Sequence, residues 1–97
     1  MTVPIYHDYS YGPPSPDTES LDDWILALAD ADRELILKKI RNLCQGDWHS
    51  VIRMEDNIYE LKINCQELIF LYFCVDREKN QLVFLKGMKV PQTQSTN

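Results

Sequence analysis

The sequence predicts a small two-layer α+β domain, and three observations support this fold class. The chain has 97 residues, of which 44% are hydrophobic, and this is enough for one core but not for two. Apolar residues recur at helical spacing in the first half and alternate at strand spacing in the second half. Short polar turns separate the runs of the second half, as in an antiparallel meander. We therefore expect a single domain over residues 1–97, in which an N-terminal strand and an antiparallel helix hairpin pack with an antiparallel sheet of three to four strands.

The first expected element is a short strand in the run VPIYHDY, residues 3–9, because this run is rich in residues that favour strands. A loop is expected over residues 10–19, where Gly12 and three prolines occur close together. Proline lacks a backbone donor and disfavours the helical conformation in the residue before it, so this segment is expected to be irregular.

Two helices are expected after this loop. Ser20 is placed to cap the first helix, and Asp22 and Asp23 would lie near the positive end of its dipole. The apolar face of this helix is expected to consist of Leu21, Trp24, Ile25, Leu28 and Ala29.

Asp30 is placed to cap the second helix, and Gly46 follows its end. The apolar face of the second helix is expected to consist of Ile36, Ile40, Leu43 and Cys44. The short connection between the helices predicts the antiparallel hairpin.

The second half is expected to form strands over residues 51–54, 58–63, 68–75 and 81–88. The run 68–75 is apolar on both faces, so this strand is expected to be central in the sheet. The core is expected to draw on Trp24, Ile25, Leu28, Ile40, Leu61, Phe70 or Leu71, and Phe84 or Leu85. No pattern continues into residues 91–97, which are expected to form a flexible tail.

The charge of the chain bears on its partners. Ten Lys and Arg residues face 15 Asp and Glu residues, which gives a net charge of −5 and a pI near 4.8. Proteins that bind nucleic acid usually carry an excess of basic residues, because these displace the counterions of the phosphates. Any contact with RNA is therefore expected to come from a local basic patch.

The sequence predicts neither a cofactor nor a metal site. Its two histidines are far apart, and Cys44, Cys65 and Cys74 lack the spacing of metal ligands. The cysteines are expected to be reduced and mostly buried thiols. The N-terminus lacks the basic start and the apolar run of a signal peptide, and the apolar run 68–75 is too short to cross a bilayer. We therefore expect a cytoplasmic protein that does not contact membranes.

Three segments resemble a known family. The run SPDTESLDDWILALADADRELILKKIRNL, residues 15–43, resembles the loop, helix, acidic link and second helix that open HigB-type, phage-derived members of the RelE/ParE toxin superfamily. The run IYELKI, residues 58–63, resembles their "hyELRi". The run LIFLYFCVDREKNQLVFLKGMKV, residues 68–90, resembles their "yRifYf.d...ivlLhgF.KK". The resemblance covers roughly residues 4–90 and implies the same small α+β fold.

This resemblance implies metal-independent cleavage of mRNA, usually on the ribosome, by the toxin of a toxin–antitoxin pair. It also implies a cognate antitoxin as partner, of the helix-turn-helix type. In such a cleavage a 2′-hydroxyl attacks the neighbouring phosphate, which requires a base, a cation for the charged phosphorane and an acid for the leaving oxygen. Arginine suits the second role because its planar fork grips phosphate with two hydrogen bonds.

The resemblance also implies catalytic positions. Lys62 and Ile69 stand where the family has two arginines, so the positive charge is kept at the first position and lost at the second. Lys86 stands at a histidine position, and Lys89 lies one place before the terminal lysine pair. With His49, whose intrinsic pKa suits acid–base work, the three lysines are the candidate catalytic residues. If Ile69 faces solvent together with the residues at its own strand parity, the site has an apolar floor that does not stabilise a phosphorane.

Arg53, Tyr59 and Tyr72 are candidate RNA-binding residues, since tyrosines stack on bases and arginine contacts phosphate. Each candidate also has a structural interpretation. Under this interpretation, the lysines are solvated side chains and His49 is an exposed loop residue. The tyrosines then pack in the core, and Arg53 forms a surface ion pair.

Two functions therefore stay open at the level of sequence. The first is an mRNA-cleaving toxin, possessing weakened activity because of Ile69 and the acidic net charge. The second is a non-catalytic RelE-like module that binds a protein through its sheet face or its helices, with exposed apolar residues outside the core pattern, such as Ile69 or Met88, as the contacts.

Overall fold

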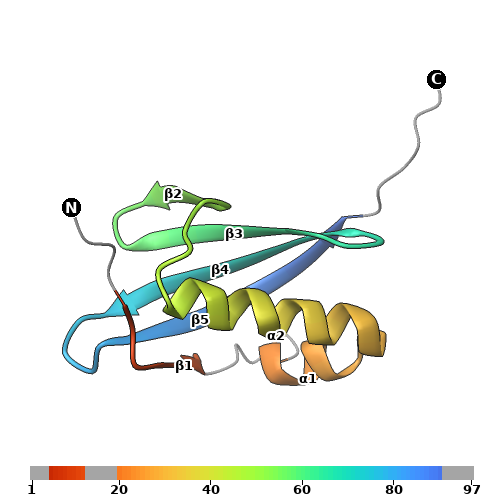
Figure 1. Cartoon of the computed structure of the whole chain (residues 1–97), viewed down its shortest axis with the longest axis horizontal. Helices are drawn as coiled ribbons and strands as arrows, with labels where there is room; N and C mark the ends of the chain where they lie inside the picture. Colours follow the sequence, from red (N-terminus) through yellow and green to blue (C-terminus); the bar gives the residue numbers. More distant parts are fainter. Residues whose placement is uncertain (1–4, 13–19, 91–97) are drawn as a thin grey trace.

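The computed structural model describes residues 5–12 and 20–90, and all structural statements below concern these residues. The predicted loop and tail therefore lie largely outside the described residues. The chain folds into five strands and two helices in the order β-α-α-β-β-β-β (Figure 1). The elements are β1 (Asp8–Tyr11), α1 (Leu21–Leu26), α2 (Asp30–Cys44), β2 (Val51–Glu55), β3 (Ile58–Asn64), β4 (Leu68–Asp76) and β5 (Gln81–Val90).

The five strands form one mixed sheet in the order β1-β5-β4-β3-β2. The four strands of the second half pair antiparallel in sequence order, which confirms the predicted meander, and β4 is central, as its apolar residues on both faces indicated. The expectation of a wholly antiparallel sheet of three to four strands is wrong, because β1 pairs parallel to β5. The meander leaves one edge of β5 without a partner, and β1 pairs with the first part of that edge, from Gln81 to Phe84.

The N-terminal strand lies later in the sequence than expected. Ile5, Tyr6 and His7 precede β1, and the strand continues to Tyr11, into the segment that was expected to be a loop. Backbone hydrogen bonds hold the chain just before and just after β1. The amide of Tyr6 donates to the carbonyl of Cys44, and the amide of Gly12 donates to the carbonyl of Phe84. Pairing with β5 therefore extends the strand beyond what local preference predicts.

Both helices lie on one face of the sheet and enclose a single core (Figure 1). The fully buried side chains of the core include Ile36, Ile40, Leu43, Ile63, Ile69, Leu71, Phe73, Leu82 and Phe84. Of the paired alternatives, Leu71 and Phe84 are buried, whereas Phe70 and Leu85 are not. The predicted contributions of Ile25, Ile40 and Leu61 to the core are confirmed, while Trp24 and Leu28 are half-buried and pack against its margin.

Helix α1 is shorter than its apolar stripe predicted. The Ser20 hydroxyl accepts a hydrogen bond from the amide of Asp23 at 3.2 Å, so the predicted N-cap is confirmed. The helix ends at Leu26 after six residues. Ala29 is exposed and occupies the N-cap position of α2, so Asp30 is the first residue of that helix and not its cap. Among the described residues, neither helix is long and apolar enough to span a bilayer.

A β-bulge in β5 changes which side chains share a face. Tyr72 lies opposite Lys86 in the ladder, but the next residue, Phe73, lies opposite Phe84, so Leu85 is an extra residue on β5. The bulge reverses the alternation of β5. Phe84 faces the helices, whereas Lys86, two residues later, faces the opposite side.

Candidate functional site

The candidate site is the face of the sheet that no described helix covers, which we call the open face (Figure 1). Residues that lie opposite one another in adjacent strands point to the same face, so the pairing register assigns its members. They are Asp8 and Ser10 of β1, Ile52 and Glu55 of β2, Ile58, Glu60, Lys62 and Asn64 of β3, Leu68, Phe70, Tyr72, Cys74 and Asp76 of β4, and Gln81, Val83, Lys86, Met88 and Val90 of β5.

One end of the open face is apolar. Leu68 lies opposite Val90, and Phe70 lies opposite Met88, so these four side chains form two adjacent rows across β4 and β5. We call them the apolar patch. Met88 and Val90 are 40% and 37% exposed, and Leu68 and Phe70 are half-buried although no described element packs over them. A contiguous exposed apolar surface is typical of an interaction site.

A polar row crosses the sheet beside the patch. Glu60, Tyr72 and Lys86 lie side by side on β3, β4 and β5. The Tyr72 hydroxyl donates a hydrogen bond to Oε2 of Glu60 at 2.9 Å. Burial, followed by this hydrogen bond, raises the pKa of Tyr72 above its usual value. Tyr72 therefore lies on the open face, and the interpretation of Tyr72 as a core residue is wrong.

The structure brings two of the predicted lysines to this face. Lys62 lies opposite Phe70, and Lys86 lies opposite Tyr72, so the lysines flank β4 on either side. With strands spaced by about 4.8 Å, β3 and β5 are about 10 Å apart across β4. Neither lysine forms an ion pair with any of the described residues.

The third predicted lysine does not join them. Lys89 lies opposite Ile69, a residue of the helix-covered face, and its Nζ is 3.2 Å from Oε1 of Glu67. Lys62, Lys86 and Lys89 therefore do not share one face of the sheet. The physical reason is strand alternation, which sends neighbouring residues such as Met88 and Lys89 to opposite faces.

Ile69 does not form part of the open face. It is fully buried against the helices and lies opposite Ile63, which is also fully buried. The hypothesis that Ile69 forms a solvent-facing apolar floor is wrong, although its shared face with Leu71 and Phe73 is confirmed. The residue that adjoins Lys62 on the open face is Phe70.

His49 and Arg53 each contact a nearby aspartate, His49 through a hydrogen bond and Arg53 through an ion pair. Nδ1 of the exposed His49 is 2.5 Å from Oδ1 of Asp47, in the connection between α2 and β2. This hydrogen bond is the main cause that lowers the pKa of Asp47. Arg53 donates from Nη2 to Oδ1 of Asp56 at 2.9 Å, so its structural interpretation as half of a surface ion pair is confirmed.

Tyr59 packs at the margin of the core, as its structural interpretation predicted. Its ring stacks on Phe73, with ring centres 5.4 Å apart, and meets Trp48 edge-on at 5.3 Å. Trp48 also donates from Nε1 to the carbonyl of Leu43 at 3.1 Å. Tyr59 therefore lies on the helix side of the sheet, away from Tyr72.

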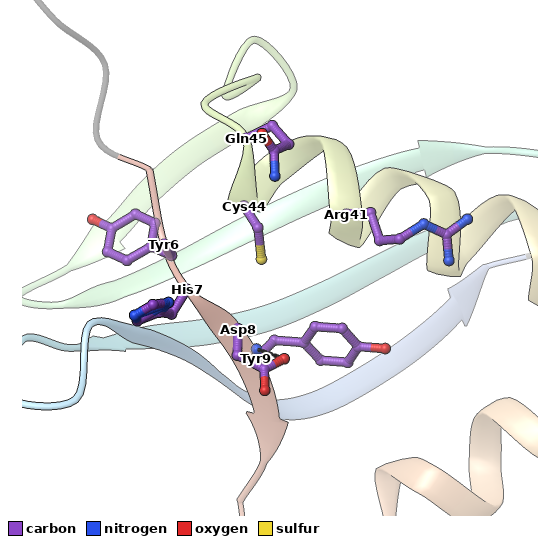
Figure 2. A pocket seen from close by; sticks show the side chains of 7 residues that line it. All are labelled: Tyr6, His7, Asp8, Tyr9, Arg41, Cys44 and Gln45. Carbon is purple, nitrogen blue, oxygen red and sulfur yellow. Dashed lines mark hydrogen bonds between the residues drawn. The ribbon is translucent and has the colours of Figure 1, made fainter.

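A pocket of about 230 Å³ lies where the segment around β1 passes the C-terminal end of α2 (Figure 2). Its lining includes Asp8, Arg41 and the Cys44 thiol. Figure 2 shows that Arg41 and His7 point away from each other, so the polar groups do not converge on a point within the pocket. Burial raises the pKa of Cys44, which disfavours the thiolate and hence its use as a nucleophile.

The three cysteines form no disulfide with one another, and Cys44 is the buried one. Within the described parts of the chain, no group of three or more His, Cys, Asp or Glu side chains is arranged to hold a metal ion.

Comparisons of the chain with known protein families, with curated proteins and with solved structures find no match. The interpretation of the site therefore depends on the geometry of the open face. Of the apolar patch, Met88 was the residue predicted for protein contacts, and it is exposed, whereas Ile69, the other residue predicted for them, is buried. Leu68, Phe70 and Val90 were not among the predicted site residues. The sequence pattern that indicates the apolar patch is the run 68–75, whose residues are apolar at successive positions. With helices on one face of the sheet, one apolar set of this strand lies on the other face.

Proposed function

We propose that this chain is a non-catalytic protein-binding module that uses the open face of its sheet. The observation that supports this function best is the apolar patch of Leu68, Phe70, Met88 and Val90, which remains accessible beside a well-packed core. Contact between two proteins buries such patches and surrounds them with polar groups. The row of Glu60, Tyr72 and Lys86 provides such a polar border.

The placement of the catalytic candidates is a second argument for a binding function. Cleavage of RNA requires a base, a cation and an acid around one phosphate. Lys89 faces the other side of the sheet, Ile69 is buried and His49 is paired with Asp47 in a loop. Lys62 and Lys86 are separated by β4 and its Phe70 and Tyr72 side chains. This dispersal is unfavourable for concerted acid–base chemistry.

Site-specific photo-crosslinking in cells that encode this chain tests the proposal. A photoreactive amino acid replaces either Met88 on the open face or Leu26, which is 59% exposed on α1. We expect Met88 to crosslink one defined protein that Leu26 does not, and Phe70→Glu to abolish this crosslink. A crosslinked protein that appears equally from both positions, or none from Met88, would contradict the proposed function.

A second candidate function is the endoribonuclease that the family resemblance implies. It is favoured by one observation: Lys62 and Lys86 lie on the same face without ion-pair partners among the described residues. Under this alternative, induced expression in a bacterial host arrests growth and cleaves transcripts. The double variant Lys62→Ala/Lys86→Ala then slows cleavage by about 10²–10⁴-fold. Intact transcripts with the unmodified chain would count against the ribonuclease and leave the binding module.

The resemblance also suggests which partner to examine first. A small helix-turn-helix protein encoded by an adjacent gene would be the antitoxin-like candidate. It should be the protein that crosslinks at Met88 if the binding module descends from a toxin–antitoxin pair.

A further inference from the structure

We infer that the open face binds an amphipathic helix whose apolar stripe is flanked by acidic residues. This inference rests on the proposed function and specifies the structure and charge of the partner segment. It follows from three properties of the open face: its paired backbone, its dimensions and the unpaired lysines beside the apolar patch.

The backbone of the open face favours a helix over a strand as the bound segment. A strand binds by adding hydrogen bonds to the edge of a sheet. Leu68 and Phe70 lie on β4, whose backbone pairs with β3 on one side and β5 on the other, so its ladders are already occupied. On the outer edge of β5, β1 pairs only with Gln81–Phe84. A strand added to that edge beside Met88 and Val90 would lie next to the patch and not over Phe70 and Lys62. A segment that docks on this face contacts side chains and must satisfy its own backbone, as a helix does.

The dimensions of the face also suit a helix. The side chains of β4 on this face run along the strand from Leu68 and Phe70 through Tyr72 to Cys74. Lys62 and Lys86 flank this line, on strands about 10 Å apart, which is close to the diameter of a helix. A helix laid along β4 therefore places its apolar stripe on Phe70 and its two sides next to the lysines.

The charges on the face identify the flanking residues of that helix as acidic. Lys62 and Lys86 lack an ion-pair partner among the described residues. The nearest carboxylate in the register, Glu60, accepts the hydrogen bond of Tyr72. A partner that covers the lysines removes water from them, and this is costly unless the partner supplies carboxylates. The net charge of −5 does not attract such a partner from a distance, so the contact is a local one.

Two designed peptides test this inference. Both are amphipathic helices of about 18 residues with the same leucine stripe. One carries glutamate at every flanking position, and the other carries lysine. Binding is measured by fluorescence anisotropy, and the binding surface is located by amide chemical shifts. We expect the acidic peptide to bind at least about tenfold more tightly than the basic peptide. The shifts should centre on Lys62, Phe70 and Lys86.

Charge reversal supplies the decisive comparison. Lys62→Glu/Lys86→Glu should make the chain prefer the basic peptide. Lys38→Glu/Lys79→Glu, which changes the net charge equally at exposed positions outside the open face, should leave the preference for the acidic peptide intact. Phe70→Glu should weaken the binding of the acidic peptide by at least about tenfold while circular dichroism shows a retained fold.

Several results would overturn the inference. They are equal binding of both peptides, binding of neither, or a preference that Lys62→Glu/Lys86→Glu leaves unchanged. Chemical shifts of the same residues with single-stranded RNA would indicate a nucleic-acid surface, and a dimer that Phe70→Glu dissociates would indicate a second copy as occupant. If the inference fails while the Met88 crosslink persists, the proposed function stands and the partner binds by other chemistry. If the peptide binds but no crosslink forms, the proposed function fails and the chemistry of the face stands.

Discussion

Trp24 lies directly against Gly87. A Cβ atom added to Gly87 would stand 2.7 Å from Cζ3 and 2.9 Å from Cε3 of the Trp24 indole, closer than carbon atoms approach in folded proteins. The bulge at Leu85 points Gly87 toward the helices, and the missing side chain lets α1 pack closely on β5. A glycine inside this strand thus marks the docking point of a helix.

Gly87→Ala should therefore lower the free energy of unfolding by about 1–3 kcal/mol, because the rigid indole cannot yield without moving α1. Urea unfolding followed by tryptophan fluorescence measures the change.

Gly12→Ala is the matched control for Gly87→Ala. Its Cβ would lie 3.1 Å from the end of the exposed Leu85 side chain, which can move away. An equal loss in both variants would show that packing of Trp24 on Gly87 is not the cause. Trp24→Leu should restore part of the loss in the Gly87→Ala background.

Ile69→Arg should destabilise the protein by about 3–5 kcal/mol, since it places an unpaired charge in the core between the sheet and the helices. Soluble yield and chemical denaturation provide the measurement. Phe70→Arg, one residue later on the open face, is the control and should cost much less, because its side chain stays in contact with water. A stable Ile69→Arg variant would mean that residue 69 faces solvent and that the helices cover the other face.

Asn57 connects the turn between β2 and β3 to the end of β4. It adopts a left-handed conformation with φ of 57°, its Nδ2 donates to the carbonyl of Val75 at 3.1 Å, and its Oδ1 accepts from the amide of Val75 at 3.3 Å. Asn57→Gly keeps the conformation and loses the two bonds, so it should cost about 1–2 kcal/mol in the free energy of unfolding. Asn57→Ala should cost about 1 kcal/mol more, because alanine also disfavours the positive φ.

The control for Asn57 is Asn80, which has φ of 52° and whose side chain forms one long hydrogen bond within the described residues, at 3.4 Å to the carbonyl of Ile5. Asn80→Gly should be nearly neutral in the same unfolding assay. If Asn57→Gly were equally neutral, the side-chain bonds to Val75 would not contribute to stability.

Tyr11 should make stability sensitive to alkaline pH. Burial, followed by the neighbouring Tyr9 and Asp22, raises the pKa of Tyr11 from 10.0 to about 12. Between these values the unfolded chain releases the phenolic proton while the folded chain keeps it. The stability that the neutral phenol contributes is therefore complete below pH 10 and is lost as the pH rises toward about 12.

Phenylalanine has no phenolic proton, so the stability of Tyr11→Phe does not depend on this titration. Between pH 10 and about 12 the unmodified chain should therefore lose unfolding free energy relative to the variant. Urea unfolding at several pH values measures the difference, and ultraviolet titration of the phenol checks the assignment. A difference that stays constant with pH would show that Tyr11 titrates normally in the folded protein.

Much of the fold was predictable because it depends on local patterns. The meander follows from alternating strands and short turns, and Ser20 begins α1 because its hydroxyl satisfies a backbone amide. The end of α1 was not predictable, since the apolar stripe continues to Leu28 although the helix stops at Leu26. An isolated helix of this length has no stability of its own, so α1 depends on packing such as that of Trp24 against Gly87 of β5.

The candidate site was predictable only in part. The sequence alone determined that Ile69, Leu71 and Phe73 share one face of a central strand and that Phe70 and Tyr72 share the other, because side chains alternate in any strand. The sequence does not distinguish which of these two apolar sets the helices cover. Only the tertiary structure decided that the helices cover the Ile69 set and leave the Phe70 set open, since this choice depends on which way the chain crosses the sheet.

The position of Lys86 was decided in the same way. Strict alternation from Leu82 and Phe84 would turn Lys86 toward the helices, where its charge would be buried. The extra residue at Leu85 turns Lys86 to the open face beside Tyr72 and turns Gly87 toward Trp24. A bulge arises from the fit between two strands and a helix packed on them, so it carries no pattern within β5 itself. The sequence determined the strands and their alternation, whereas the face that the helices cover and the bulge in β5 determined which lysines and apolar side chains meet on the open face.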